Sequence, residues 1–91
     1  MRYEWDETKY LRNLKKHGIR FEDALLVFSD LNALEMFDIS LVEEERIVMI
    51  GLNPHKGVLV IVYSEPRENV TRIISARKAT LMEEKQYEKG I

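Results

Sequence analysis

The spacing of apolar residues predicts two helices in the first third of the chain. In the stretch from about Asp6 to His17 the apolar residues fall on one side. Asp6 is a suitable N-cap for this helix and Gly18 is a suitable residue to end it. From about Phe21 to Ser29, apolar residues recur at i, i+3, i+4 and i+7, which predicts a second helix with one side in the core.

The middle of the chain predicts an antiparallel sheet. Arg46 to Leu52 and Val58 to Ser64 are rich in Ile and Val and flank an Asn-Pro-His-Lys-Gly turn, so they are expected to form a hairpin. A second turn leads into Val70 to Ala76, which reads as a further strand. Ala33 to Asp38 is a weaker candidate for a fourth strand, because its apolar residues do not alternate cleanly.

A last helix is predicted from about Thr80 to Lys89, where Thr80 and Glu83 have the spacing of a capping box. Leu81 and Met82 are expected to pack in the core, with an interface as the alternative. The predicted fold is α+β, with two N-terminal helices, an antiparallel meander sheet of three or four strands and a C-terminal helix. Residues 1–91 are expected to form a single domain.

Composition narrows the class of protein. The chain has 91 residues, no cysteine and a formal net charge of −2, which excludes a disulfide scaffold and a cysteine-ligated metal. The sequence has neither an apolar run near the roughly 20 residues of a membrane helix nor a signal-peptide pattern, so a cytoplasmic protein without a membrane partner is expected. The basic charge is local, since residues 12–20 contain Arg12, Lys15, Lys16, His17 and Arg20 and no acidic residue. A basic site therefore remains open despite the overall charge.

Several kinds of catalytic site have no signature in the sequence. The two histidines are far apart, no glycine-rich phosphate loop is present, and no serine has the setting of a nucleophile elbow. We therefore expect no metal and no cofactor. The remaining candidates for chemistry are cationic side chains and the phenols of tyrosine. Arg72 either pairs with an acid of Glu43 to Glu45 or acts as a phosphate fork, and Arg77 with Lys78 is either solvated or an anion site.

Other polar and aromatic residues have two interpretations each. His17 ends the first predicted helix and either interacts with the helix dipole or serves as an acid or base. Lys9 is either a solvated charge or a phosphate contact. Trp5 is either a core anchor or a base-stacking residue, and Tyr63 either packs at the end of its strand or donates a proton.

Two blocks of sequence resemble a known family. The first is Trp-Asp-x-x-Lys, ending at Lys9, and the second is Ile-Ser-Ala-Arg-Lys-Ala, residues 74–79. With Glu44-Glu45-Arg46, Thr80, Glu83 and Tyr87, they stand in the order and spacing of the BrnT family of bacterial toxins. The resemblance implies a RelE-like fold and a type II toxin, a ribonuclease that inhibits translation and is neutralised by a BrnA-type antitoxin. Operator DNA would be bound only through the complex with that antitoxin.

The resemblance further implies metal-independent cleavage in which the ribose 2′-OH attacks the adjacent phosphate. Such chemistry needs a proton acceptor, cations for the phosphorane and a donor for the leaving oxygen. Arg72 and Arg77 are the expected phosphate stabilisers, with Lys9 and His17 for proton transfer or phosphate contact. The candidate catalytic residues are Arg72, Arg77, Lys9, His17, Glu45 and Tyr63. The candidate RNA-binding residues are Arg12, Lys16, Arg46, Lys78, Tyr87 and Trp5.

The sequence departs from the family pattern at two places. Leu81, Met82 and Glu84 stand where many members carry arginines, and the turn at residues 64–68 is more acidic than expected. Both differences reduce the positive potential near the expected RNA surface. The alternative hypothesis is therefore a catalytically weak or inactive member that acts as a protein-binding or regulatory module with its antitoxin. An independent DNA-binding domain is disfavoured, since no pair of helices resembles a recognition motif.

Overall fold

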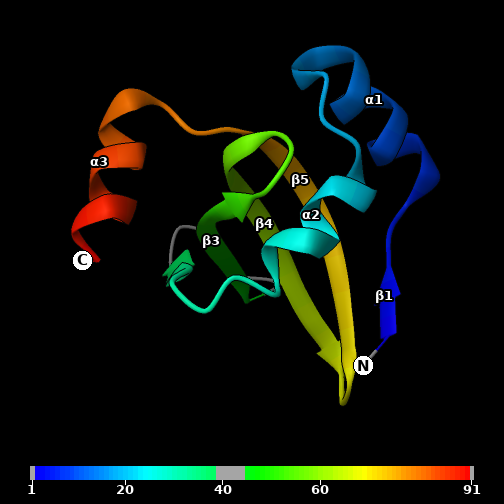
Figure 1. Ribbon diagram of the computed structural model, residues 1–91. Coiled ribbons are helices and arrows are strands. Elements are labelled where there is room, and N and C mark those ends of the chain that lie inside the picture. Colours follow the sequence, from blue (N-terminus) through cyan, green and yellow to red (C-terminus); the bar gives the residue numbers. More distant parts are fainter. Residues whose placement is uncertain (1, 39–44, 91) are drawn as a thin grey trace.

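The computed structural model describes residues 2–38 and 45–90, which form three helices and five strands (Figure 1). The helices are α1 (Glu7–His17), α2 (Phe21–Val27) and α3 (Leu81–Lys89). The strands are β1 (Arg2–Glu4), β2 (Leu34–Asp38), β3 (Arg46–Asn53), β4 (Gly57–Arg67) and β5 (Val70–Lys78). The predicted α+β class is confirmed, with two helices before the main strands and one after them.

The sheet is mixed and has the strand order β1-β5-β4-β3-β2. Strands β2 to β5 form the predicted antiparallel meander, and the weak fourth strand is present as β2. The prediction of a purely antiparallel sheet is wrong, because β1 pairs with β5 in parallel, with Tyr3 opposite Thr71. Strand β1 has only three residues, too few for an alternating pattern, and it is formed by pairing with the far end of the chain.

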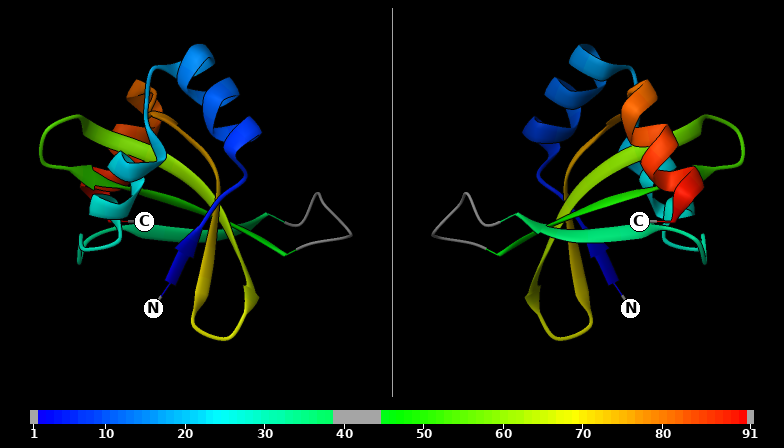
Figure 2. Two further views of the ribbon diagram at one scale, coloured as in Figure 1. Left: turned by 90° about the vertical axis from the view of Figure 1, so that its right-hand side faces the viewer. Right: turned by 90° about the vertical axis from the view of Figure 1, so that its left-hand side faces the viewer.

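The core lies between one face of the sheet and the first two helices. Buried Phe21, Ala24 and Val27 of α2 pack on the apolar residues of β3, β4 and β5 that point toward them. Figure 1 shows α2 in front of these strands, with α1 beside β5 and α3 beside β3. In Figure 2 the β4–β5 hairpin projects beyond the helices with β1 next to it. Helices α1 and α2 thus cover one face of the sheet.

Caps fix the ends of α1 as predicted. The Asp6 side chain accepts a hydrogen bond from the Thr8 N–H at 3.0 Å. Gly18 has φ 70° and its N–H donates to the Leu14 carbonyl, which ends the helix. Helix α2 ends at Val27, two residues before the predicted Ser29. The segment that follows turns back, so that Ser29 donates to the Leu26 carbonyl.

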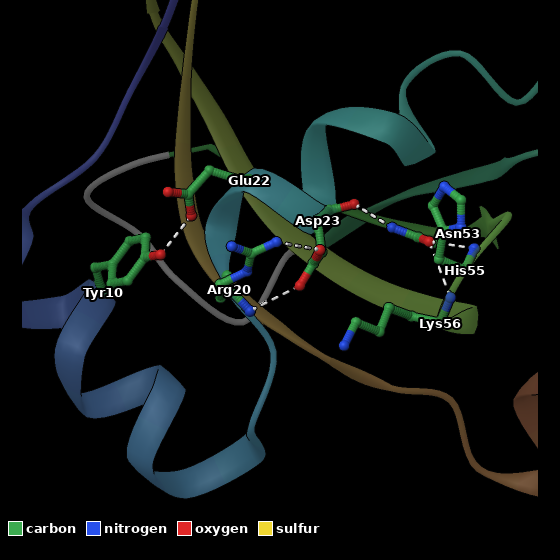
Figure 3. A network of polar contacts seen from close by, with 7 residues as sticks. All are labelled: Tyr10, Arg20, Glu22, Asp23, Asn53, His55 and Lys56. Carbon is green, nitrogen blue, oxygen red and sulfur yellow. Dashed lines mark hydrogen bonds and ion pairs between the residues drawn. The ribbon is translucent and has the colours of Figure 1, made fainter.

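A polar network ties the β3–β4 turn and α1 to α2 (Figure 3). Buried Asn53 donates to the Asp23 carbonyl at 2.8 Å, and its side-chain oxygen accepts from the backbone N–H groups of His55 and Lys56. Across α2, the Tyr10 hydroxyl donates to the Glu22 carboxylate. These bonds hold the turn in place, while the His55 side chain is exposed.

Helix α3 is held by polar contacts, and the prediction that its apolar residues pack in the core is wrong. Leu81 and Met82 are 76% and 79% exposed. The inward side of α3 instead carries Glu83, which pairs with Arg77, and Tyr87, whose hydroxyl donates to Asp30 at 2.6 Å. The capping box at Thr80 is confirmed, with the Glu83 N–H donating to the Thr80 hydroxyl. Within residues 2–38 and 45–90, no helix has the length and apolar character to span a membrane.

Candidate nucleic-acid interface

The interface begins where a helix takes the place of a strand. Strand β1 pairs with β5 only as far as Arg72, so the later part of β5 has no strand on that edge. Helix α1 lies there instead. The Asn13 side chain donates to the Ala76 carbonyl at 2.8 Å and accepts from the Ala76 N–H at 3.1 Å. Because Asn13 is buried, these bonds fix α1 against the edge of β5.

A basic groove of about 300 Å³ lies between α1 and this edge. We call it the α1–β5 groove, and its lining residues are Lys9, Arg12, Asn13, Lys16, His17, Ile74 and Ser75. Lys9, Arg12 and Lys16 are spaced i, i+3 and i+7, which places three cations on one side of the helix. None of these lining residues is acidic. The groove is therefore suited to an anion.

A β-bulge brings Ile74 to the groove. In the pairing of β4 with β5, Val62 lies opposite Ser75 while Tyr63 lies opposite Ile73, so Ile74 has no partner on β4. A bulge of this kind changes the direction of a side chain at the edge of a sheet. It also adjusts the alternation along β5, so that Arg72 and Arg77 both point to the face away from α1 and α2. Along β5, Arg72 and Arg77 thus stand before and after the groove residues Ile74 and Ser75, but neither arginine lines the groove.

Arg72 is held by an acid from β1. Its guanidinium contacts the Glu4 carboxylate at 2.9 Å, and Glu4 also contacts Arg67 at 2.6 Å. Hydrogen bonds from Arg72 and Arg67 lower the pKa of Glu4, so the carboxylate stays charged. The predicted acids Glu43 and Glu44 lie outside the described residues. Arg72 thus forms an ion pair, and Glu4 is a partner that the sequence analysis did not identify.

Arg77 is held by α3. Its Nη1 and Nη2 atoms donate to the two carboxylate oxygens of Glu83, each at 2.8 Å. This contact lowers the pKa of Glu83 to about 2 and raises the pKa of Arg77, so both groups are charged at neutral pH. The side chain of Arg77 remains 37% exposed. Glu83 therefore has a second contact besides the capping box that the sequence predicts.

Other predicted RNA contacts are spread around this site. Arg46 begins β3 and is half-buried on the same sheet face as Arg72, as the alternation along β3 requires. Lys78 is exposed at the end of β5. Glu45 is exposed and lines a separate small cavity of about 90 Å³ with Phe37 and Glu65, so the structure does not bring it into the groove.

The three aromatic candidates lie elsewhere. Tyr63 is 4% exposed and packs on Phe28 in the core, and burial raises the pKa of its hydroxyl. Trp5 packs on Tyr10 and Phe21, which supports its interpretation as a core anchor. The Tyr87 hydroxyl donates to Asp30, which raises its pKa to about 12. In the structure Tyr63 and Trp5 are thus packing residues and Tyr87 is a contact that holds α3, while their roles toward RNA stay predictions.

Comparison with known proteins assigns the chain to a family. Residues 5–83 match the family described as the ribonuclease toxin BrnT of a type II toxin–antitoxin system. The chain belongs to the BrnT family. The crystal structure of the Brucella abortus ribonuclease toxin BrnT is similar, with a TM-score of 0.66 and 23% identity over 88% of this chain and 97% of that chain. At this identity the likeness shows the fold alone. No curated protein matches the sequence.

Membership in the BrnT family gives the general class of the protein. The family consists of ribonuclease toxins, and the toxin of a type II system has a protein antitoxin as its partner. The α1–β5 groove, Arg72 and Arg77 all lie within the matched residues. Within the part of the chain that the structure describes, no group of His, Cys, Asp and Glu residues is placed to hold a metal ion.

Proposed function

We propose that the protein is a metal-independent endoribonuclease that binds RNA in the α1–β5 groove. The observation that carries this proposal is a groove that is lined by Lys9, Arg12, Lys16 and His17 and by no acidic residue. RNA carries one phosphate per nucleotide, and arginine and lysine side chains are the groups that bind it through charge-assisted hydrogen bonds. Membership in a family of ribonuclease toxins supports the reaction class, and the cations of the groove support RNA binding there.

The proposed reaction is an internal transesterification. The ribose 2′ oxygen forms a bond to the adjacent phosphorus and the bond from phosphorus to the 5′ oxygen breaks, which leaves a 2′,3′-cyclic phosphate and a 5′-hydroxyl. His17 and Lys9 are the groove residues that can accept the 2′-OH proton and return one to the leaving oxygen. None of these reaction steps needs a metal ion.

The arginines stabilise the charge that develops on the phosphorane. Arg72 and Arg77 lie on β5 before and after the groove residues Ile74 and Ser75, and each guanidinium can bind two phosphate oxygens. Arg12 and Lys16 contact neighbouring phosphates from α1, and Arg46 and Lys78 extend the basic surface along the sheet. This division of roles separates residues that act on the reacting phosphate from those that hold the strand.

The proposal extends to the biological context. The antitoxin is of the BrnA type, operator DNA is bound only by the complex of the two proteins, and RNA cleavage inhibits translation in the cytoplasm. These proposals rest on family membership rather than on any contact in the structure.

The test is cleavage of end-labelled RNA by the purified protein in excess EDTA. Products with cyclic or 3′-phosphate ends are expected, and an RNA with a single 2′-deoxy nucleotide is expected to resist cleavage at that position. Cleavage that stops in EDTA, or that proceeds at the 2′-deoxy position, would contradict the proposed reaction. Arg72→Ala is expected to reduce cleavage at least about tenfold if the protein remains folded.

One observation favours the alternative, a catalytically weak member that acts mainly by binding its antitoxin. Arg72 and Arg77, the two arginines assigned to the phosphate, both form ion pairs with carboxylates. Induced expression in growing cells separates the two functions. Growth arrest that co-expression of the antitoxin relieves favours the ribonuclease, whereas normal growth with stable antitoxin binding favours the binding module.

A further inference from the structure

The guanidinium of Arg77 is only partly used by its protein contacts. Arginine has five N–H donors, two on each terminal nitrogen and one on Nε. Nη1 donates to Glu83 Oε1 at 2.8 Å and to the Lys78 carbonyl at 3.2 Å. Nη2 donates to Glu83 Oε2 at 2.8 Å. The Nε–H and the second hydrogen of Nη2 have no protein partner within residues 2–38 and 45–90.

These two remaining donors form a fork of their own. A guanidinium is planar and has two edges that can bind a pair of oxygens, one made by Nη1 and Nη2 and the other by Nη2 and Nε. Glu83 occupies the first edge, so the second edge is left for another anion. The Arg77 side chain is 37% exposed, so solvent reaches part of it.

The carboxylate that holds Arg77 is itself held in place. Glu83 Oε1 accepts the Thr80 N–H at 2.8 Å, and the Glu83 N–H donates to the Thr80 hydroxyl at 3.2 Å. This capping box connects the end of β5 to the first turn of α3. The Thr80 backbone N–H therefore fixes Oε1 of Glu83, and the two contacts of the carboxylate with Arg77 fix the plane of the guanidinium.

We propose that Glu83 is a positioning residue, which holds the Nη1/Nη2 edge of Arg77 so that its Nη2/Nε edge binds a phosphate of the RNA substrate. This inference rests on the proposed function and adds the residue that orients one of its arginines. The competing interpretation of the ion pair is that Glu83 neutralises Arg77 and must release it before RNA binds. The two readings predict opposite effects when the carboxylate is removed.

Glu83→Gln is the informative variant, because glutamine also occurs in capping boxes and can accept the Thr80 N–H through its amide oxygen. Its amide NH₂ cannot accept from Nη2, so the two-point contact with Arg77 is lost. Thr80→Val is the matched control. It removes the hydroxyl of the cap and leaves both carboxylate oxygens for Arg77. Melting temperatures of both variants report how far α3 is destabilised.

We expect Glu83→Gln to lower kcat for RNA cleavage about tenfold with little change in KM, and Thr80→Val to leave kcat within about twofold. In an Arg77→Ala background, Glu83→Gln is expected to have no further effect, since Glu83 acts through Arg77. Higher activity of Glu83→Gln would overturn the proposal in favour of neutralisation. An equal loss of kcat in both single variants that follows their melting temperatures would overturn it in favour of a structural role.

A binding measurement separates this proposal from the ribonuclease itself. The Arg77 Nε–H resonance is followed by NMR while a 2′-O-methyl oligonucleotide, which cannot be cleaved, is added. A shift in the wild type that is lost in Glu83→Gln supports the positioning role, even if the wild type cuts no RNA and the ribonuclease proposal fails. No shift in the wild type, or the same shift in Glu83→Gln, would overturn the positioning role regardless of cleavage.

Discussion

Asn13 of α1 pairs with Ala76 of β5 through two hydrogen bonds, as a residue of a neighbouring strand would. Its amide nitrogen also donates to the Ile19 carbonyl at 3.0 Å, so a single buried side chain connects α1, the loop after it and the sheet. The same contact sets the distance between the basic side of α1 and β5. The α1–β5 groove therefore depends on a residue that carries no charge.

We expect Asn13→Ala to destabilise the protein by about 1–3 kcal/mol, because the Ala76 N–H and carbonyl lose their partner in a buried place. Urea unfolding followed by circular dichroism measures this loss. Asn32→Ala, at an exposed asparagine, is the control and is expected to change stability by less than about 0.5 kcal/mol. Equal stability of the Asn13 variant and the wild type would show that the two bonds do not hold α1.

Tyr63→Phe is expected to leave RNA cleavage within about twofold of the wild type. The ring packs on Phe28 at a centroid distance of 5.0 Å, and this packing does not need the hydroxyl. Cleavage of labelled RNA under single-turnover conditions is the measurement. A loss of tenfold or more in a folded variant would return Tyr63 to the catalytic group.

Local features of the fold were predictable from the sequence. The caps of α1 and α3 and the β3–β4 hairpin depend on residues close together in the chain, so their patterns are informative. Strand β1 depends on a distant part of the chain, since it forms by pairing with β5. The exposure of Leu81 and Met82 was also missed, because the ion pair of Glu83 and the hydroxyl of Tyr87 turn the polar side of α3 inward.

The candidate site was predictable in part for the same reason. The basic stripe of α1 follows from helical spacing, and the structure brings Lys9, Arg12, Lys16 and His17 together in one groove. Which acids pair with the arginines depends on tertiary contacts, so Glu4 was not foreseen as a partner of Arg72. Alternation along β4 did not show which face holds Tyr63, because both faces of that strand are apolar.

A substitution at Gly51 tests the packing between α2 and β3. A Cβ at this position would lie 2.6 Å from Val27 Cγ1 and 3.0 Å from the Ala33 Cβ. We expect Gly51→Ala to lower the free energy of unfolding by about 1–3 kcal/mol, because Val27 is fully buried and has little room to move. Gly57→Ala is an informative comparison, since it meets no neighbouring atom but has φ 87°, so its cost comes from the backbone alone. A Gly51 variant as stable as the wild type would contradict the close packing.

The ion pair of Glu83 with Arg77 predicts a pH dependence of stability. The pKa of Glu83 falls from 4.5 to about 2 on folding, so the carboxylate stabilises the folded protein above about pH 4.5 and loses this effect as the pH falls toward 2. Glu83→Gln is expected to be less stable by about 1 kcal/mol at neutral pH, since Arg77 is partly exposed to solvent. Urea unfolding of both proteins across this range should show the difference disappear near pH 2. A difference that is independent of pH would exclude the charge as its cause.

Binding of RNA in the α1–β5 groove is tested by removing the same number of charges from the groove and from a distant surface. Arg12→Gln with Lys16→Gln removes two charges from the groove, and Lys56→Gln with Lys85→Gln removes two from exposed positions elsewhere. Affinity for a 2′-O-methyl oligonucleotide is measured at several salt concentrations. We expect about tenfold or greater weakening and a smaller salt dependence for the groove pair, with the control pair close to the wild type. Equal weakening by both pairs would contradict a site in the groove.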